Sequence, residues 1–250
     1  MSLIETECLV LRCYNLAEAD KIVVMLTRDH GLVRGVAKGA KRLKSKFGST
    51  LEPFSLVSVC YAQKENLELV SIKRSDLVRS CFFAANDPEA QEHLAYIAEL
   101  LISFVPPNEP NERIYRMIRA CLQSFAQETD SLSRIVVYFE IWILRLSGYL
   151  PEWDRCVDCG VIFTSTDISH IQPDFRLQCG NCNRSGNGRI LSGSMIEIIG
   201  MSKKLSPEEF LRETANKTAI LSELSVILGS LISHVIGNSR AVHSNGAIRY

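Results

Sequence analysis

Short apolar runs separated by polar residues fill the first third of the chain and predict β-strands. They are rich in β-branched and aromatic residues, which fit a pleated sheet, and they cover residues 8–14, 21–27, 32–37, 54–62 and 67–72. Turn-forming residues at 29–31 and 64–66 join neighbouring runs. We therefore expect five strands in an antiparallel, meander-like order.

Five short strands within one small region favour a β barrel. The commonest template of this size is the oligonucleotide/oligosaccharide-binding (OB) fold, although periodicity alone does not separate it from SH3-like barrels. We place a five-stranded OB-type barrel at residues 1–80.

Beyond Pro88 the apolar residues repeat with the helical period of about 3.6 residues. Three stripes, at residues 94–102, 114–125 and 132–146, predict three helices. Ser206, Pro207 and Glu209 are typical of the start of a further helix. The pattern predicts an α+β multidomain protein, in which an α-helical domain at residues 81–250 follows the barrel.

The most apolar stretch, residues 219–236, keeps a helical period and is interrupted by Glu223 and His234. It predicts a buried amphipathic helix and not a membrane span, so we expect no membrane partner. The first residues include Glu5 and Glu7 where a secretory signal has basic residues. We expect a cytoplasmic protein with reduced thiols.

Charge is balanced overall but uneven along the chain. The 28 Lys and Arg residues cancel the 28 Asp and Glu residues, which argues against nucleic-acid or membrane binding by the whole surface. The first 80 residues hold 13 basic and 9 acidic residues, and the remainder holds 15 and 19. Any binding of phosphates must therefore rest on a local patch, and the barrel is the basic part.

One candidate patch is the basic segment, residues 34–46. It holds six cations, with no acidic residue between His30 and Leu51: Arg34, Lys38, Lys41, Arg42, Lys44 and Lys46. This density predicts a loop that contacts a phosphate backbone. Phe47, Phe54 and Tyr61 are available to stack on bases or to fill the core, and the core is favoured for Phe54. The alternative is a solvated charge run that only maintains solubility.

Two CxxC pairs carry the clearest chemistry in the sequence. Cys156 and Cys159 form one pair, Cys179 and Cys182 form the other, and nineteen residues separate the pairs. Four thiolates at this spacing predict one structural Zn²⁺ in tetrahedral coordination, with no open position for water or substrate. The alternatives are four ordinary buried cysteines, a redox CxxC, or His170 in place of one ligand.

The predicted zinc-binding segment, residues 153–186, interrupts the helical domain. Gly160 directly follows Cys159, and Gly180 directly follows Cys179; both are expected to let the backbone bend sharply. The residues between the two pairs have the length of a hairpin. The remaining cysteines fit strand or helix patterns and are expected to be small core residues: Cys8, Cys13, Cys60, Cys81 and Cys121.

Motifs of common enzyme classes are missing from the sequence. It has no glycine-rich phosphate loop with its Lys-Ser/Thr, no GxSxG, no HExxH, and no HxE before a CxxC. The acidic residues are scattered, and no two of them are singled out by their spacing as a catalytic pair. We expect a protein that is not an enzyme, and a nuclease built from distant acids stays an alternative.

Several segments resemble one known family. They are NLAEADK at 15–21, TRDHG at 27–31, AKGAKR at 37–42, KSKFG at 44–48, LEPF at 51–54 and LSGYLP at 146–151, which leads into the first cysteine pair. They are similar to segments of the bacterial RecO family of recombination mediators, of the RecFOR repair pathway. The resemblance covers nearly the whole chain in order.

The resemblance implies an OB domain, a helical domain, and a zinc segment that some relatives lack. It implies a mediator of DNA repair and homologous recombination that binds single- and double-stranded DNA and anneals complementary strands. With RecR, such proteins help RecA displace single-strand DNA-binding protein (SSB), whose tail docks on the helical domain. The six cations match the family's basic loop, and the four cysteines match its metal ligands.

Two other classes of function stay open. A zinc-ribbon regulator would bind specific duplex sequences through a helix that is basic along one face, and no predicted helix has such a face. The related alternative is an interaction module without annealing activity. A metal-dependent hydrolase needs an open metal position, which four thiolates do not leave.

Overall fold

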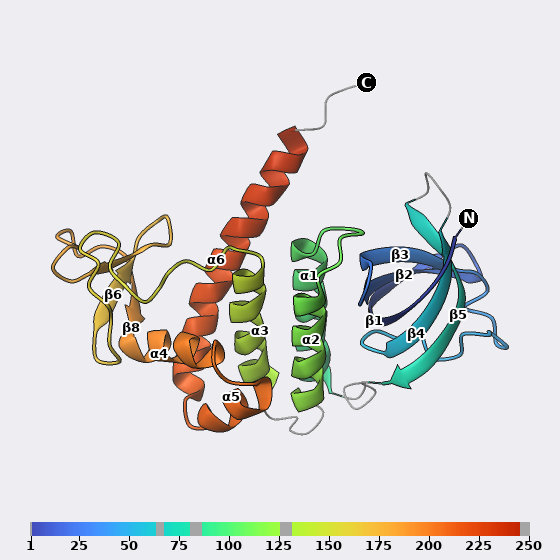
Figure 1. The fold of residues 1–250 in the computed structure, drawn as a ribbon, viewed down its shortest axis with the longest axis horizontal. Coiled ribbons are helices and arrows are strands. Elements are labelled where there is room, and N and C mark those ends of the chain that lie inside the picture. Colours follow the sequence, from blue (N-terminus) through green and yellow to red (C-terminus); the bar gives the residue numbers. More distant parts are fainter. Residues whose placement is uncertain (1, 64–67, 81–86, 126–131, 246–250) are drawn as a thin grey trace. The chain divides into compact units, whose positions relative to one another are not determined.

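The computed structural model describes residues 2–63, 68–80, 87–125 and 132–245, with side chains up to residue 237. The chain forms two compact units, residues 1–129 and 130–250 (Figure 1). The domain boundary expected near residue 80 stays a prediction, and each unit is described here by itself.

The first unit contains a closed five-stranded barrel, so the predicted OB-type architecture is confirmed. The strands are hydrogen-bonded in the order β1-β2-β3-β5-β4. Their bounds are β1 (Ser2–Leu16), β2 (Asp20–Thr27), β3 (Gly31–Ala37), β4 (Leu56–Gln63) and β5 (Leu69–Arg79). The predicted turn at 29–31 joins β2 to β3, whereas the predicted turn at 64–66 lies outside the described residues.

The strand order is not the meander that the sequence suggested. β4 pairs with β1, from Ser2 opposite Gln63 to Leu9 opposite Leu56, and β5 lies between β4 and β3, parallel to β3. The chain therefore leaves β3 and crosses to the far side of the barrel through residues 38–55 before it forms β4. Periodicity shows only which face of a strand is buried, and so it does not determine which strands pair.

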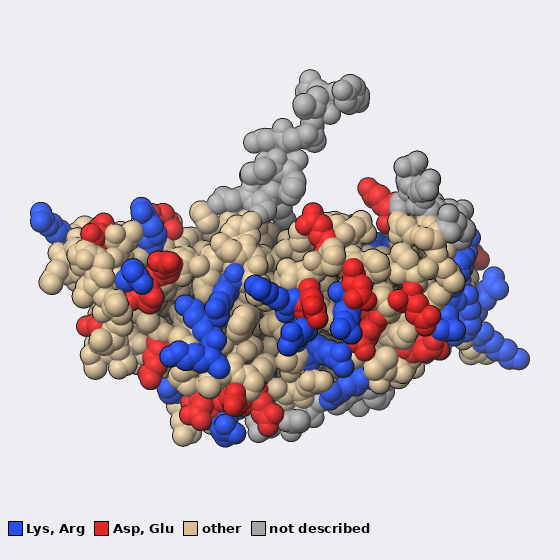
Figure 2. Space-filling model, viewed as in Figure 1, with Lys and Arg blue, Asp and Glu red and all other residues tan. Residues whose placement is uncertain are grey.

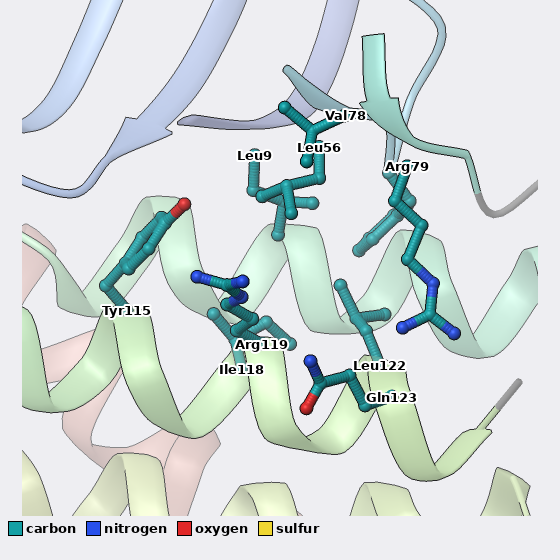
Figure 3. Close-up of a pocket in the computed structure, with 10 residues that line it drawn as sticks. Leu9, Leu56, Val78, Arg79, Tyr115, Ile118, Arg119, Leu122 and Gln123 are labelled. Carbon is teal, nitrogen blue, oxygen red and sulfur yellow. The ribbon is translucent and has the colours of Figure 1, made fainter. Parts of the chain in front are cut away.

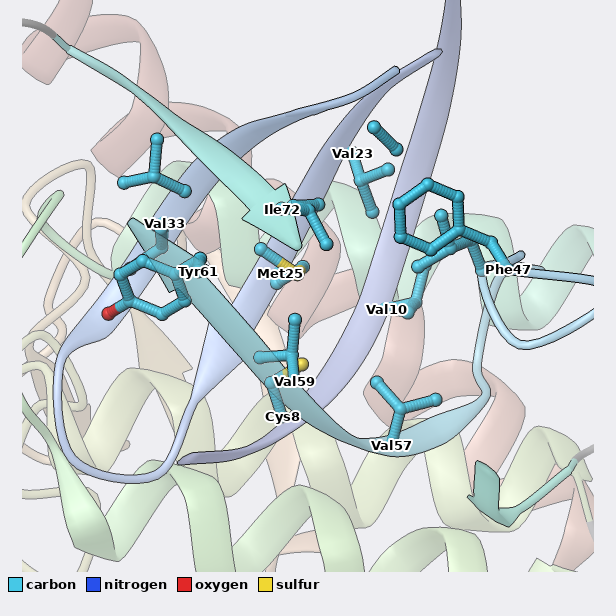
Figure 4. Close-up of a cluster of buried hydrophobic side chains, with 13 residues drawn as sticks. Cys8, Val10, Val23, Met25, Val33, Phe47, Val57, Val59, Tyr61 and Ile72 are labelled. Carbon is cyan, nitrogen blue, oxygen red and sulfur yellow. The ribbon is translucent and has the colours of Figure 1, made fainter. Parts of the chain in front are cut away.

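The barrel core is built from alternating strand residues and from the crossing segment. Cys8 and Val10 of β1 point inside, as do Val23 and Met25 of β2 (Figure 4). Phe47, which precedes β4 in the crossing segment, joins the same core with only 1% of its side chain exposed. Burying a phenylalanine contributes about 2–3 kcal/mol. The crossing segment is therefore fastened to the barrel interior.

Two helices complete the first unit: α1 (Pro88–Phe104) and α2 (Glu112–Phe125). The Asp87 side chain caps α1 by accepting the backbone N–H groups of Glu89 and Ala90. The helices α1 and α2 bury the apolar stripes that the sequence predicted, with Ile97, Leu101, Ile114, Ile118 and Phe125 among the buried residues.

The second unit is built from α3 (Leu132–Leu146), α4 (Gly193–Ser202), α5 (Pro207–Glu213) and α6 (Thr218–Asn245), with a small sheet between α3 and α4. α5 begins where the sequence predicted a helix start. A capping box forms there: the Ser206 hydroxyl accepts the Glu209 N–H, and the Glu209 carboxylate accepts the Ser206 N–H. Two aromatic side chains of α3 hydrogen-bond to the end of α4 and to the loop after it. Trp142 Nε1 donates to the Ser202 carbonyl at 2.9 Å, and Tyr138 Oη donates to the Leu205 carbonyl at 3.0 Å.

Helix α6 is long and apolar enough, by length and composition, for its Thr218–Gly237 portion to cross a membrane. The sequence had suggested that the polar residues in this stretch rule that out. A core helix of a soluble protein meets the same criterion, so this is weak evidence. In the second unit α6 buries Leu221, Leu224, Leu228 and Leu231 at helical spacing, which agrees with the amphipathic helix that we expected.

Candidate metal centre and nucleic-acid interface

The four predicted cysteine ligands come together in the second unit. The Sγ atoms of Cys156, Cys159, Cys179 and Cys182 all lie within 4.8 Å of one another, and those of Cys159 and Cys179 are 3.7 Å apart. In a tetrahedral site with metal–sulfur bonds of about 2.3 Å, the sulfur atoms are about 3.8 Å apart. The cluster therefore has the dimensions of a four-thiolate metal site.

A three-stranded sheet positions the two cysteine pairs. It has the order β7-β6-β8 and consists of β6 (Ile168–Ile171), β7 (Leu177–Cys179) and β8 (Arg189–Ser192). β6 and β7 form an antiparallel hairpin between the pairs, and Cys179 ends β7. The first pair is tied to this hairpin, because the Val157 N–H donates to the Leu177 carbonyl at 2.8 Å.

The two turns around the cluster are made differently. Gly160 has a φ of +73°, which a residue with a side chain rarely adopts, and its N–H donates to the Cys156 carbonyl at 3.0 Å. Gly180 also lies in a turn, as expected, but outside the left-handed region, so its backbone conformation does not require glycine. At the second pair, the backbone N–H groups of Cys182 and Asn183 both donate to the Cys179 carbonyl and form the turn.

The thiols differ in acidity. Burial raises the pKa of Cys156, but the backbone N–H groups of Cys159, Cys179 and Asp158 outweigh this effect and lower the pKa to about 6. The neighbouring thiols of Cys179 and Cys159 raise the pKa of Cys182 to about 12. Four adjacent thiolates therefore need a nearby positive charge, which a divalent metal ion supplies.

Among the described residues, His170 does not belong to the cluster; it lies on β6, opposite Gln178 of β7. The structure therefore does not support it as a ligand. Cys8 and Cys121 are fully buried, as predicted, while Cys13 and Cys60 are half-buried. Burial raises the pKa of Cys13 to about 11. Cys81 lies outside the described residues.

The six cations of the basic segment lie on the first unit and are all exposed. Arg34 is on β3, and the other five are in the crossing segment that follows it. None of the six forms an ion pair within the part of the chain that the structure describes; the Lys46 Nζ lies 5.0 Å from the centre of the Phe47 ring. Figure 2 shows Lys and Arg side chains projecting from the outer edge of the barrel. These charges are free to meet phosphates.

The basic segment is held in place at several points. The Gly39 N–H donates to Asp20 Oδ1 at 2.8 Å, and the Lys41 N–H donates to the Ala19 carbonyl at 2.9 Å. After the last cation, Phe47 is buried in the barrel. The segment is thus fixed to the β1–β2 turn on one side and to the barrel core on the other.

The aromatic residues considered for stacking are not available for it. Phe47, Phe54 and Tyr61 are 1%, 4% and 1% exposed. The core position favoured for Phe54 is confirmed. Of the two alternatives for Phe47 and Tyr61, the core is the one that the structure shows: the crossing segment folds Phe47 back onto the barrel, and Tyr61 belongs to the barrel core from β4. Leu43, which is fully exposed among the cations, was not singled out from the sequence. The sequence feature that could have identified it is an apolar residue within a basic segment.

The first unit also contains a cavity of about 200 Å³ beside α2 (Figure 3). Leu9, Leu56 and Leu122 form much of its apolar lining, and Arg79 and Arg119 contribute charge. Arg119 already donates to Glu7 at 2.9 Å. The lining has no arrangement of nucleophile and base, and so it gives no support to an enzymatic site.

Comparison with known proteins agrees with the resemblance seen in the sequence. Residues 1–81 match the family described as Recombination protein O N terminal, and residues 85–243 match Recombination protein O C terminal. The DNA repair protein RecO of Geobacter metallireducens is 33% identical over 233 residues, which is 90% of this chain and 94% of that protein. The DNA repair protein RecO of Koribacter versatilis is 34% identical over 180 residues, 72% of each chain.

Proposed function

Because the chain belongs to the RecO family, we propose that it is a mediator of DNA repair and homologous recombination that binds single- and double-stranded DNA. It anneals complementary strands and, with RecR, helps load RecA onto single strands coated with SSB. One observation carries this proposal: the basic segment presents six exposed cations on an OB-type barrel, and none has a carboxylate partner among the residues described. Such barrels bind nucleic-acid strands through basic surfaces.

The proposed mechanism of annealing is electrostatic and needs no bond-breaking chemistry. Two strands repel each other through their phosphates, and cations on one surface neutralise both strands and let complementary bases meet. Six contacts to single-stranded phosphates give a slope of about −4 for log affinity against log salt, at about −0.7 per contact. The protein therefore acts in this proposal as a mediator and not as an enzyme.

The metal in this proposal is one structural Zn²⁺ held by Cys156, Cys159, Cys179 and Cys182. The fit rests on the sulfur spacing and on the charge that the cluster needs. A four-thiolate ion is saturated, so it stabilises the fold of residues 153–186 and does not activate water or substrate. The proposed partners are DNA, RecR and the SSB tail, and the proposed location is the cytoplasm, at the nucleoid during repair.

The first test measures binding of a fluorescent single-stranded oligonucleotide across a salt series. In a Lys41→Ala/Arg42→Ala/Lys44→Ala variant, three lost contacts should flatten the slope by about two. A control variant with Arg184→Ala, Lys203→Ala and Lys204→Ala loses the same charge from exposed positions of the second unit and should keep the wild-type slope. Equal slopes in all three proteins would remove DNA binding from the basic segment.

A second test follows annealing of two complementary labelled strands by energy transfer. The Lys41/Arg42/Lys44 variant should anneal them more slowly than the wild type and the charge-matched control, while circular dichroism shows the same folded content. An unchanged annealing rate would contradict the charge-neutralisation mechanism. An intact fold with neither DNA binding nor annealing in the wild type would favour the interaction module.

A further inference from the structure

Leu43 is the most exposed large apolar residue among those that the structure describes. Its relative exposure is 102%, against 70% for Leu3, the next on the same scale. The other apolar side chains of the crossing segment behave differently, because Phe47 and Leu51 are buried in the barrel core. No described part of the chain covers Leu43, although an exposed leucine loses the favourable free energy of burial.

The backbone holds Leu43 at the tip of a tight turn. The Ser45 N–H donates to the Arg42 carbonyl at 2.9 Å, which places Leu43 at the first central position of the turn. The preceding turn is closed by the Arg42 N–H and the Gly39 carbonyl at 3.1 Å. Gly39 is in turn bonded to Asp20. The apolar side chain is therefore presented outward by a fixed framework.

Cations surround Leu43 along the chain. Lys41, Arg42 and Lys44 are exposed and have no ion pair in the described part of the protein. If these cations bind successive phosphates of a strand, the Leu43 side chain between them faces the sugars and bases of that strand. An isolated exposed leucine needs no explanation by itself, but a leucine fixed at the centre of a phosphate-binding loop is in a position to contact bases.

We propose that Leu43 inserts between neighbouring bases of bound single-stranded DNA, while Lys41, Arg42 and Lys44 hold the flanking phosphates. This inference rests on the proposed function and deepens it by naming a base-contacting residue. A single strand fits better than a duplex, because an apolar wedge must unstack a paired step and one leucine supplies little burial to offset that cost. Leu43 therefore makes the segment prefer unpaired strands, independently of sequence.

The experiment compares wild type, Leu43→Ala and Leu43→Met on a single-stranded oligonucleotide that contains 2-aminopurine, whose fluorescence rises when its base is unstacked. Leu43→Ala should weaken binding about fivefold at every salt concentration, which is about 1 kcal/mol, and should leave the salt slope unchanged. The fluorescence rise should be lost in Leu43→Ala and retained in Leu43→Met. Affinity for a duplex of the same length should not change.

Leu3→Ala is the matched control, because it makes the same substitution at an exposed position of β1 in the same unit; it should bind as the wild type does. If Leu43→Ala keeps both affinity and fluorescence, or weakens single-strand and duplex binding equally, the base contact is wrong. Different results would contradict the proposed function itself. These are a wild type that shows no salt-dependent DNA binding, or a Lys41/Arg42/Lys44 variant that keeps the wild-type salt slope.

Discussion

Gly31 lies so close to Glu109 that a Cβ atom added to Gly31 would fall 2.0 Å from the Glu109 carbonyl oxygen. The neighbouring residues form a regular contact, since the Asn108 N–H donates to the Leu32 carbonyl at 3.0 Å and Leu32 bridges with Pro107. The connection between α1 and α2 is thus fixed to the start of β3 by backbone alone.

Replacing Gly31 by alanine should therefore destabilise the first unit by about 3 kcal/mol. Two costs add: the φ of +66° disfavours any side chain, and the new Cβ collides with the Glu109 backbone. Gly48→Ala is the matched control, because Gly48 has a φ of +51° but has no atom within 4 Å of the added Cβ; it should cost about 1 kcal/mol. Urea unfolding measures both, and equal losses would show that the contact with Glu109 is unimportant.

Tyr115 of α2 donates its buried hydroxyl to Glu7 Oε1 of β1 at 2.9 Å, and Arg119 Nη1 donates to the same oxygen at 2.9 Å. Tyr115→Phe should lower the free energy of unfolding by about 1–2 kcal/mol, because a hydrogen bond to a charged group is lost at a partly buried site. Tyr14→Phe, at a half-exposed position, should change it by less than about 0.5 kcal/mol. A double-mutant cycle with Arg119→Ala checks the assignment: strict additivity would mean that Glu7 does not couple the two side chains.

Metal binding should release protons and should weaken as the pH falls. Thiolates are the ligands, and without an ion the pKa of Cys182 is raised to about 12, so at neutral pH this thiol must lose its proton on binding. Below about pH 6 the Cys156 thiol is protonated as well, so the pH dependence should steepen there. Calorimetric titration with Zn²⁺ in buffers of different ionisation enthalpy measures the released protons; no release at pH 7 would contradict the thiolate cluster.

Metal analysis of the protein purified without chelator complements that titration. It should find about one Zn²⁺ per chain, and Cys182→Ser should reduce the content while Cys60→Ser leaves it unchanged, because Cys60 lies on β4 in the other unit. Removal of the ion should unfold residues 153–186 locally. Full metal content in Cys182→Ser would exclude Cys182 as a ligand.

Local features of this protein were predictable from the sequence, and long-range ones were not. The cysteine spacing predicted the sulfur cluster because a metal site of this kind uses two short turns that the sequence shows directly. The positions of the five strands were visible in the apolar runs. The pairing of β3 with β5 was not, since it depends on the path of residues 38–55 across the barrel.

The aromatic residues illustrate the same limit. Phe47 follows four lysines and one arginine in the crossing segment, and from the sequence its ring could either stack on bases or fill the core. The segment instead turns back at Phe47 and buries it with Leu51 in the barrel. Leu43, four residues earlier, is instead fully exposed. Local periodicity does not predict which of the two residues is buried.

The attachment of the basic segment at Gly39 and at Phe47 separates the positions that hold this loop on the barrel from those that form its exposed tip. Of the residues between these points, Ala40 packs against the barrel core, whereas Lys41, Arg42, Leu43, Lys44 and Lys46 are exposed. Substitutions at these exposed positions should therefore alter the charge and shape of the tip with little change in barrel stability. If this stretch binds DNA as proposed, changes at these exposed positions alone should alter the strength of DNA binding. The same stretch can be exchanged between relatives in the laboratory while the two fastening residues stay fixed.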